Sequence, residues 1–286
     1  MCPVFQGTFY GKRVIRFMIT STSNQQIKQI SALLKKSKER REKKSFVVEG
    51  PKMVQEAPAD WLKAVYVSEF FVEKPENKEF LRELEEKCES VQVPYEIVAD
   101  SVFKSVSDTQ TPQGIMAVVK MPAYQMEQLL QGDYTHLLVL ESVQDPGNLG
   151  TMVRTGEGAG ITGVIMNKTT VDLFNPKTIR STMGSIYRVP FLVAEDLTDM
   201  MKSLKQQGVS LYAAHLKGQH VYDEEDYTKA CGFLIGNEGN GLSDEIADLA
   251  DTYIKIPMEG QVESLNAAIS ATLLMYEANR QRRNKS

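Results

Sequence analysis

The sequence predicts an α/β protein in which a mostly parallel β-sheet carries helices on both faces and is preceded by a smaller α/β unit. In the second half of the chain, short apolar runs alternate regularly with helical stretches, a pattern typical of parallel sheets. In the first half, four β-branched or aromatic runs accompany a charged helix. The 286 residues are 42% apolar and 24% charged, which is usual for a globular protein and excludes a disordered chain.

The first unit is expected to span residues 25–120, after an extension of residues 1–24 that shows no clear periodicity. Apolar residues recur at helical spacing between 25 and 44 and positive charges fill the other face, so we expect one basic amphipathic helix there. The remaining elements expected in this unit are strands at 46–48, 64–67, 95–98 and 115–119 and a helix at 78–88.

Residues 121–133 contain Pro122 and Gly132 around a short amphipathic turn and are expected to form a linker. The second domain, residues 134–286, follows. Its expected strands are 136–140, 163–166, 189–193, 209–213, 232–235 and 253–256, and its expected helices are 149–158, 197–207, 243–249 and 265–282. Ligands of such sheets bind at the carboxyl ends of the strands.

The composition also excludes several classes of protein. No apolar run approaches the roughly 20 residues that cross a bilayer, and the first 20 residues carry Lys12, Arg13 and Arg16 where a signal peptide needs an apolar core. We therefore predict a cytoplasmic protein without a membrane partner.

Cysteines and histidines are too few and too scattered for a metal site or a disulfide framework. We predict no metal and no redox chemistry, and interpret the histidines as structural. His215, just past a predicted strand end, is the histidine closest to the loops discussed below. The residues concerned are Cys2, Cys88, Cys231, His136, His215 and His220.

Charge is distributed unevenly along the chain. The net charge is −4, but residues 28–52 carry nine basic and three acidic residues and are therefore net +6, which leaves −10 for the remainder. Such a run is usually a solvated helix face, and a nucleic-acid contact is the alternative. The candidate nucleic-acid-binding residues are Lys35, Lys36, Lys38, Arg40, Arg41 and Lys44, and a smaller basic run closes the chain at Arg280, Arg282, Arg283 and Lys285.

One apparent motif is a false match. Residues 158–163 fit the dinucleotide-binding pattern G-x-G-x-x-G, but a helix precedes them and a strand follows, the reverse of what that motif requires. We interpret these glycines as a left-handed helix end. Asn167-Lys-Thr169 matches a glycosylation sequon, which would not be used in a cytoplasmic protein.

Three loops of the second domain each follow a predicted strand at its carboxyl end. The first, 141–154, has strong turn residues before Asn148 and places Arg154 nearly two helical turns beyond it. In the second, 236–241, three glycines allow a close backbone approach around Glu238. In the third, 256–266, Ser264 is positioned to cap the final helix.

Together these loops resemble the motifs of the SpoU (TrmH-like) family of RNA ribose 2′-O-methyltransferases, members of the SPOUT class. The resemblance rests on Asn148 with Arg154, on Asn237-Glu238-Gly239, and on Ile256-Pro257-Met258 with Ser264-Leu265-Asn266. It covers about 150 residues in the family's order. The first unit is similar, less specifically, to the family's α/β/α RNA-binding substrate domain at 46–50 and 112–115.

The resemblance implies a trefoil knot in the second domain, a homodimer, and S-adenosylmethionine as the cofactor. By carry-over, the cofactor-binding residues are Gly236, Ile256, Leu265 and Asn266, the last of which we expect to tie loops together. The final helix carries Leu265, Ile269, Leu273 and Tyr276 on one stripe, which is interpreted first as core packing and second as a two-fold interface.

The implied catalytic residues are Arg154, Asn148, Glu238 and Ser264. The family places Arg154 beside the reacting 2′-oxygen and it is often assigned as the base, but a charged guanidinium has no acceptor. Binding a phosphate or stabilising the developing oxyanion is the more conservative role. Glu238 is expected to pair with Arg154, or else to cap the helix that begins near Ser243, while Asn148 and Ser264 are expected to orient Arg154 and the ribose.

The function predicted is therefore S-adenosylmethionine-dependent methylation of a ribose 2′-hydroxyl in structured RNA, with rRNA favoured over tRNA. One alternative is a non-catalytic RNA-binding protein that keeps the fold. A weaker alternative is methylation of a base by a related knotted enzyme.

Overall fold

The computed structural model describes residues 4–9 and 12–285, which form two compact units. The first comprises residues 1–122 together with 174–176, and the second comprises 123–173 together with 177–286. Within the described residues, none of the helices is long and apolar enough to cross a membrane.

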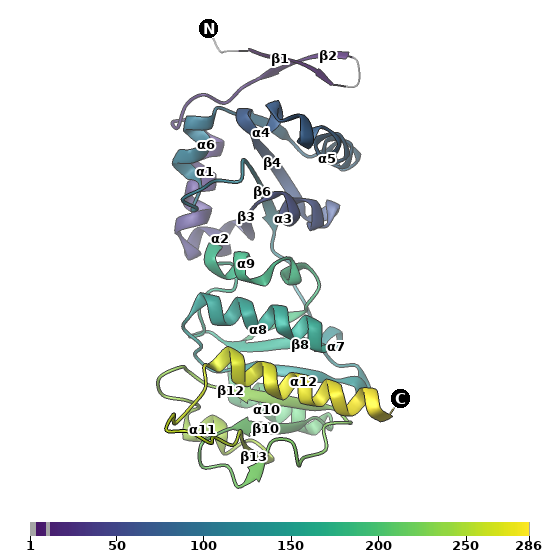
Figure 1. Ribbon diagram of the computed structural model, residues 1–286, viewed down its shortest axis with the longest axis vertical. Coiled ribbons are helices and arrows are strands. Elements are labelled where there is room, and N and C mark those ends of the chain that lie inside the picture. Colours follow the sequence, from purple (N-terminus) through teal and green to yellow (C-terminus); the bar gives the residue numbers. More distant parts are fainter. Residues whose placement is uncertain (1–3, 10–11, 286) are drawn as a thin grey trace. The chain divides into compact units, whose positions relative to one another are not determined.

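The first unit is built on a four-stranded sheet in the order β3-β6-β4-β5 (Figure 1). The pair β4–β5 is parallel and the other two pairs are antiparallel. The strands are β3 (Ser45–Glu49), β4 (Leu62–Ser68), β5 (Tyr95–Val98) and β6 (Ile115–Lys120), each within a few residues of its predicted range.

Helices cover this sheet, and a hairpin precedes it. One apolar cluster joins α1 and α6 to one face of the sheet. The helices of the unit are α1 (Gln25–Lys35), α2 (Ser37–Lys43), α3 (Pro51–Glu56), α4 (Glu69–Glu73), α5 (Lys78–Ser90) and α6 (Asp100–Val106). Within the region expected to be an extension, β1 (Val4–Phe9) and β2 (Lys12–Phe17) pair antiparallel, and Ile19 bonds to the edge of β5.

The single basic helix expected over 25–44 is in fact two helices. Lys36 has the extended angles φ −125° and ψ 115°, which break the chain between α1 and α2. Ile27, Ile30 and Leu33 are buried as predicted. The prediction of one helix was wrong because the break carries no glycine or proline to mark it.

The second unit is built on seven strands in the order β11-β13-β10-β12-β7-β8-β9, and all six pairings are parallel. Six of the strands match predicted ones, and the two-residue β11 was not predicted. Their bounds are β7 (His136–Leu140), β8 (Gly163–Asn167), β9 (Phe191–Ala194), β10 (Ser210–Ala214), β11 (His220–Val221), β12 (Cys231–Ile235) and β13 (Thr252–Lys255).

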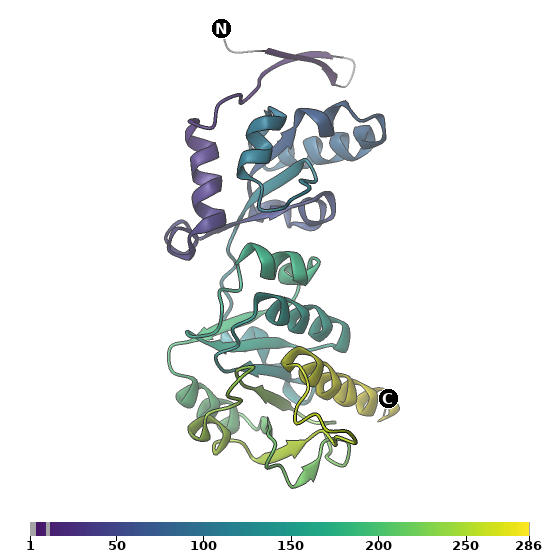
Figure 2. The same cartoon turned by 60° about the vertical axis from the view of Figure 1, so that its left-hand side comes forward.

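Helices lie on both faces of this sheet. One apolar cluster joins α7, α10 and α11 to the strands, whereas α8 and α12 pack against each other and lie side by side in Figures 1 and 2. The bounds are α7 (Met126–Leu129), α8 (Pro146–Ala159), α9 (Pro176–Thr182), α10 (Leu197–Gln206), α11 (Asp244–Ala247) and α12 (Ala267–Lys285).

Two features of the second unit differ from expectation. Residues 123–133, expected as linker, belong to this unit, and Leu129 is fully buried in its core. On α12, Ala268, Ala271, Leu274, Met275 and Ala278 are buried, whereas the predicted core residues Ile269 and Tyr276 are 51% and 44% exposed. The core interpretation was therefore wrong for Ile269 and Tyr276, whereas Ala268 and Ala271, which the sequence also marks as allowing close approach, are buried.

The glycines at 158–163 end a helix, as predicted. Gly160 adopts φ 76°, and its N–H bonds to the last turn of α8, while the N–H of Ile161 reaches the carbonyl of Gly156 at 2.9 Å. The chain then enters β8 directly.

Side-chain hydrogen bonds tie the base of the second sheet to α12. The Arg282 guanidinium donates to the carbonyls of Tyr134 and Thr135, both at 3.0 Å, and of Lys229 at 2.7 Å. Burial, reinforced by Arg282, lowers the pKa of His136 to about 3, so the neutral imidazole is the folded form. Within the described residues, its Nε2 is buried without a hydrogen-bond partner.

We expect this histidine to make folding stability depend on pH. The unfolded chain binds a proton near pH 6.5 and the folded chain only near pH 3, so stability falls as the pH drops through that window. The loss attributable to His136 is about 2 kcal/mol between pH 7 and pH 5. Urea denaturation over that range should show a shallower pH dependence for His136→Leu than for the wild type. Parallel curves for His136→Leu and the wild type would contradict this origin.

Candidate active site at the carboxyl edge of the second sheet

The three candidate loops lie at one edge of the seven-stranded sheet. They follow β7, β12 and β13, and because all strand pairings are parallel, the carboxyl ends of these strands share that edge. β12 pairs directly with β7, while β10 separates it from β13. The loops are therefore neighbours in space although they are up to about 120 residues apart in sequence.

Side-chain hydrogen bonds join the three loops. Asn148 Nδ2 donates to Glu238 Oε1 at 3.0 Å, and Asn266 Nδ2 donates to Asn148 Oδ1 at 3.0 Å. Asn266 Oδ1 in turn accepts the N–H groups of Ala268, at 2.9 Å, and Ile269, at 3.3 Å, at the start of α12. Asn266 thus ties the loops together, the role expected from the sequence.

Glu238 does not pair with Arg154, and it does not cap α11. Its carboxylate instead accepts the N–H groups of Gln144 at 2.9 Å and Asp145 at 3.0 Å, in addition to Asn148. Partial burial raises the pKa of Glu238, but these hydrogen bonds outweigh it and leave the pKa below its ordinary value. The expected pairing fails because Glu238 bonds to groups where α8 begins, and Arg154 lies about 9 Å further along that helix.

Other residues supply the hydrogen bonds at the start of α11. Ser243 Oγ accepts the N–H of Ile246 at 3.3 Å, and the Glu141 carboxylate accepts the N–H and hydroxyl of Ser243 at 2.8 and 2.7 Å. Glu141, the first residue of the first loop, therefore ties that loop to α11.

The second loop is a tight turn closed by its own backbone. Asn237 and Gly241 exchange N–H···O bonds of 3.0 and 2.9 Å. A Cβ on Gly236 would lie 2.1 Å from the carbonyl carbon of Gly241 and 2.2 Å from the nitrogen of Leu242, so only glycine fits. Asn237 Oδ1 accepts from Gly239 at 2.9 Å, and its Nδ2 donates to the carbonyl of Ser142 at 2.9 Å, which holds the turn against the first loop.

Sequence reasoning missed Asn167 as a supporting residue. It stands at the end of β8, and its Oδ1 accepts the N–H of Ser142 at 2.9 Å and that of Thr170 at 3.1 Å. Ser142 has φ 56°, a left-handed conformation that this contact holds in place. The available signal was a polar amide directly after a buried strand, at the edge where the other loops gather.

The side chains of Arg154 and Ser264 are exposed, and neither side chain makes a hydrogen bond or ion pair within the described chain. Arg154 therefore remains accessible to a ligand. The expectation that Ser264 caps the last helix was wrong: α12 begins at Ala267, and Asn266 accepts from its first N–H groups. Asn148, bonded to Glu238 and Asn266, does not orient Arg154 directly.

The third loop leaves its main chain available. None of the backbone groups from 256 to 265 makes a backbone hydrogen bond inside the described part of the protein. Ile256 and Leu265 are half-buried there, and Leu265 directly precedes the Asn266 contact. Unpaired N–H and C=O groups fit a cofactor with an adenine ring, which has both donors and acceptors.

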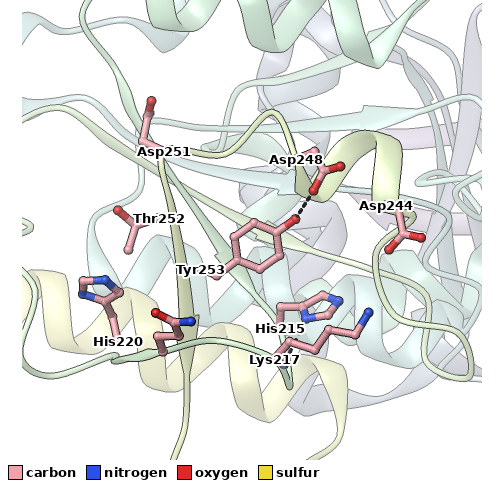
Figure 3. A pocket seen from close by; sticks show the side chains of 9 residues that line it. His215, Lys217, His220, Asp244, Asp248, Asp251, Thr252 and Tyr253 are labelled. Atoms are coloured by element: carbon pink, nitrogen blue, oxygen red, sulfur yellow. Dashed lines mark hydrogen bonds between the residues drawn. The ribbon is translucent and has the colours of Figure 1, made fainter.

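A cavity of about 440 Å³ lies beside β13 rather than over these residues. Figure 3 shows Tyr253 at its centre, with its hydroxyl bonded to Asp248 at 2.6 Å. His215 packs edge-on against Tyr253, and its Nδ1 accepts the N–H of Lys217. Gly236, Ile256, Leu265 and Asn266 are absent from its lining, so the cavity does not mark the predicted cofactor loops.

The basic residues of the first unit divide into exposed and buried ones. Arg40 is only 3% exposed, and its guanidinium donates to the carbonyls of Leu33 at 2.6 Å and Leu34 at 3.1 Å, where α1 ends. Its assignment as an RNA-binding residue was therefore wrong, because its charge is used to satisfy a helix end. The exposed members of the predicted set are Lys35, Lys36, Lys38, Arg41 and Lys44.

The described cysteines and the described groups that could bind a metal ion are arranged as follows. Among the described residues, no group of three or more His, Cys, Asp or Glu is arranged to hold a metal ion. Burial raises the pKa of the Cys231 thiol to about 11, which makes it unreactive. Cys88 is buried as well, and Cys2 lies outside the described residues.

Comparison with known proteins identifies the class. The model of the SpoU rRNA Methylase family matches residues 135–276, and that of the MRM3-like substrate binding domain matches residues 24–117. The chain belongs to the SpoU family, and it is an S-adenosylmethionine-dependent RNA methyltransferase. The predicted α/β fold class, family and cofactor are confirmed, and the non-catalytic alternative is set aside.

Particular relatives are similar over nearly their whole length. The 23S rRNA (guanosine(2553)-2′-O)-methyltransferase RlmP of Bacillus subtilis is 34% identical over 90% of this chain and 97% of its own. The AdoMet-bound rRNA methyltransferase of Sinorhizobium meliloti is 30% identical with a TM-score of 0.83, covering 92% of this chain and 97% of its own. The SpoU methyltransferase AviRb of Streptomyces viridochromogenes is 26% identical with a TM-score of 0.81, covering 92% and 99%.

We expect Gly236→Ala to disrupt cofactor binding through the backbone. The added methyl group would collide with main-chain atoms of Gly241 and Leu242, so the turn must open. Calorimetry with S-adenosylmethionine should show an affinity at least about tenfold weaker, equivalent to about 1.4 kcal/mol. Gly239→Ala is the matched control, because its Cβ would meet only Asn237 Oδ1 at an ordinary 3.5 Å. Equal affinities for the two variants would argue against a cofactor site at this turn.

Proposed function

We propose that this protein methylates a ribose 2′-hydroxyl in structured RNA, with ribosomal RNA favoured over transfer RNA. The observation that carries the proposal is Arg154, an exposed guanidinium without a partner in the described chain, on a helix whose start is fixed to two other loops. The relatives support the same chemistry, since RlmP is a 2′-O-methyltransferase of 23S rRNA.

S-adenosylmethionine supplies an already activated methyl group when bound, so the protein's task is to place the hydroxyl and manage its charge. We propose that Gly236, Ile256 and Leu265 hold the cofactor through the main chain, and that Asn266 keeps their loops together. Orienting two reacting groups can remove about 7–11 kcal/mol from a barrier. The bonded set Glu238–Asn148–Asn266 is suited to this, because it fixes loop positions before substrate arrives.

Arg154 is best suited to anion binding. Because the guanidinium stays charged and has no acceptor atom, it cannot readily take the hydroxyl proton. It can bind the adjacent phosphate bidentately, or stabilise negative charge that develops on the 2′-oxygen, while water or a phosphate oxygen accepts the proton. Ser264, exposed in the third loop, offers a neutral hydrogen bond to the ribose.

The exposed residues of the predicted basic set, in and next to α1 and α2, form the proposed RNA-binding surface of the first unit. They are Lys35, Lys36, Lys38, Arg41 and Lys44. Of these, Lys38 makes only a 3.8 Å contact with Glu42, which exchanges easily for a phosphate. Such contacts contribute affinity without sequence preference.

We also propose a homodimer. Ile269 and Tyr276 project from α12 with about half of their surfaces exposed, on the helix that packs against the Arg154-bearing α8. A second copy covering these side chains would bring its own surface close to Arg154. The trefoil knot and the cytoplasmic location stay predictions.

We expect Arg154→Ala to abolish methyl transfer while leaving cofactor binding intact. The side chain makes no described internal contact, so its removal should not unfold the protein. Transfer of a labelled methyl group to ribosomal RNA should fall by at least about a hundredfold, the usual cost of losing one oxyanion-stabilising group, with unchanged calorimetric affinity for S-adenosylmethionine. Nuclease digestion and mass spectrometry of the wild-type product should place the methyl group on a ribose. A methylated base would instead establish the base-methylation alternative, and equal turnover by both proteins would remove the role of Arg154.

We expect the double variant Lys35→Ala, Lys38→Ala to bind RNA more weakly and with a smaller salt dependence. Loss of two phosphate contacts should reduce the slope of log affinity against log salt by about 1.5–2. Thermal stability should hardly change, because both side chains are exposed. Arg40→Ala is the contrasting variant: it should destabilise the fold by about 1–3 kcal/mol by leaving buried carbonyls unpaired. An unchanged salt slope in the double variant would show that these two lysines do not contact RNA, and would contradict the proposed surface.

A further inference from the structure

The segment formed by α9 and the 3₁₀ helix η4 (Ser185–Tyr187), which no sequence signal predicted, packs along α8. At Gly150 the two helices touch by backbone: a Cβ there would lie 2.4 Å from the Cβ of Ser181 and 2.6 Å from the carbonyl oxygen of Thr178. This contact fixes the position of α9 along α8.

Two ion pairs show in which direction the segment runs relative to α8. Lys177 Nζ lies 3.3 Å from Asp145 Oδ2, just before α8, and Arg188 Nε lies 2.5 Å from Glu157 Oε1 near its end. The two segments therefore run in the same direction along each other.

Arg154 stands between these contacts. Positions 147, 150, 154 and 157 of α8 share one helical face, because they follow the spacing i, i+3, i+7 and i+10. Ser181 meets Gly150 and Arg188 meets Glu157, so the residues that come beside Arg154 are those from 182 to 187.

Within that stretch Met183 is unusual. Its backbone adopts φ 50°, a region that non-glycine residues seldom occupy, and Gly184 follows with φ 98°. The flanking Thr182 and Ser185 are buried at 0% and 3% exposure, whereas Met183 is 41% exposed. The two left-handed residues end α9 and leave an apolar side chain exposed in the stretch that the flanking contacts place level with Arg154.

We propose that Met183 and Lys177 bind the nucleotide that is methylated: Met183 packs against its base, and Lys177 binds a phosphate of the same strand. This inference rests on the proposed function and names two positioning residues for it. Both residues belong to the segment 177–188 that follows α8, beginning beside Asp145 and passing Arg154.

The chemistry of the two side chains suits that task. The flexible, polarisable thioether of methionine packs on aromatic rings of varied shape, and unstacked RNA bases are usually held by such contacts. The Lys177 side chain is 56% exposed, and its ion pair with the 47% exposed Asp145 can exchange for a phosphate. Asp145 keeps its place without Lys177, since its Oδ1 accepts the Asn148 N–H at 2.8 Å.

The test measures single-turnover methyl transfer against RNA concentration for the full chain with saturating S-adenosylmethionine. Met183→Asn removes the apolar contact while suiting the left-handed backbone, and Met183→Leu should restore activity. Lys177→Ala removes the phosphate contact, and Lys177→Arg should restore it. Control variants are Lys202→Ala, whose lysine is 55% exposed and lies 3.5 Å from Asp199 on α10, and Val193→Asn, at a 50% exposed position on β9.

We expect Met183→Asn and Lys177→Ala each to raise the half-saturating RNA concentration about tenfold, as loss of one good contact does. Cofactor affinity and melting temperature should stay unchanged, and Lys177→Ala should lower the salt slope by about 1. The proposal is overturned if these variants match their controls, or if conservative variants lose as much. It is also overturned if gel filtration shows that Met183→Asn acts only by separating subunits. A wild type that binds cofactor but methylates no ribose would refute the proposed function itself, which is a different result.

Discussion

The site depends on one chain of hydrogen bonds, from Glu238 through Asn148 to Asn266. Each bond is individually modest, worth about 0.5–1.5 kcal/mol. Their importance lies in what they connect: a glycine turn after β12, the start of α8 and the start of α12. Because Glu238 also accepts two backbone N–H groups, a single carboxylate fixes the entry to the helix that carries Arg154.

That arrangement leaves other groups free for ligands. Asn148 and Glu238 are bonded to each other, to Asn266 and to backbone N–H groups, so they serve as support for the loops. Arg154, Ser264 and the main chain of 256–265 have no such partners in the described structure, and they are what a cofactor and an RNA strand can engage. The division between bonded supports and unpaired contacts explains why the polar residues of one motif need not all touch substrate.

The sequence predicted the parallel sheet well because strands buried on both faces read as continuous apolar runs, as in 136–140 and 231–235. It also predicted which loops meet, since parallel strands share a carboxyl edge. It could not predict contacts decided by tertiary packing. Arg40 looks like a surface charge until the end of α1 is placed over it, and the stripe of Ile269 and Tyr276 looks like core until α12 packs through its alanines.

The composition of α8 shows how the helix that carries Arg154 is held in place. Glycine in a helix interior costs up to about 1 kcal/mol relative to alanine, and this helix nevertheless has Gly150 and Gly156 within 14 residues. Gly150 leaves room for α9 to approach closely. Gly156 leaves room for the side chain of Ile161, and Met275 of α12 also lies against it. Helix propensity is thus given up for close contact with two neighbouring helices. Since Arg154 lies between those two glycines, its backbone is fixed on both sides while its guanidinium stays exposed, and a substitution at either glycine should displace it without touching any ligand.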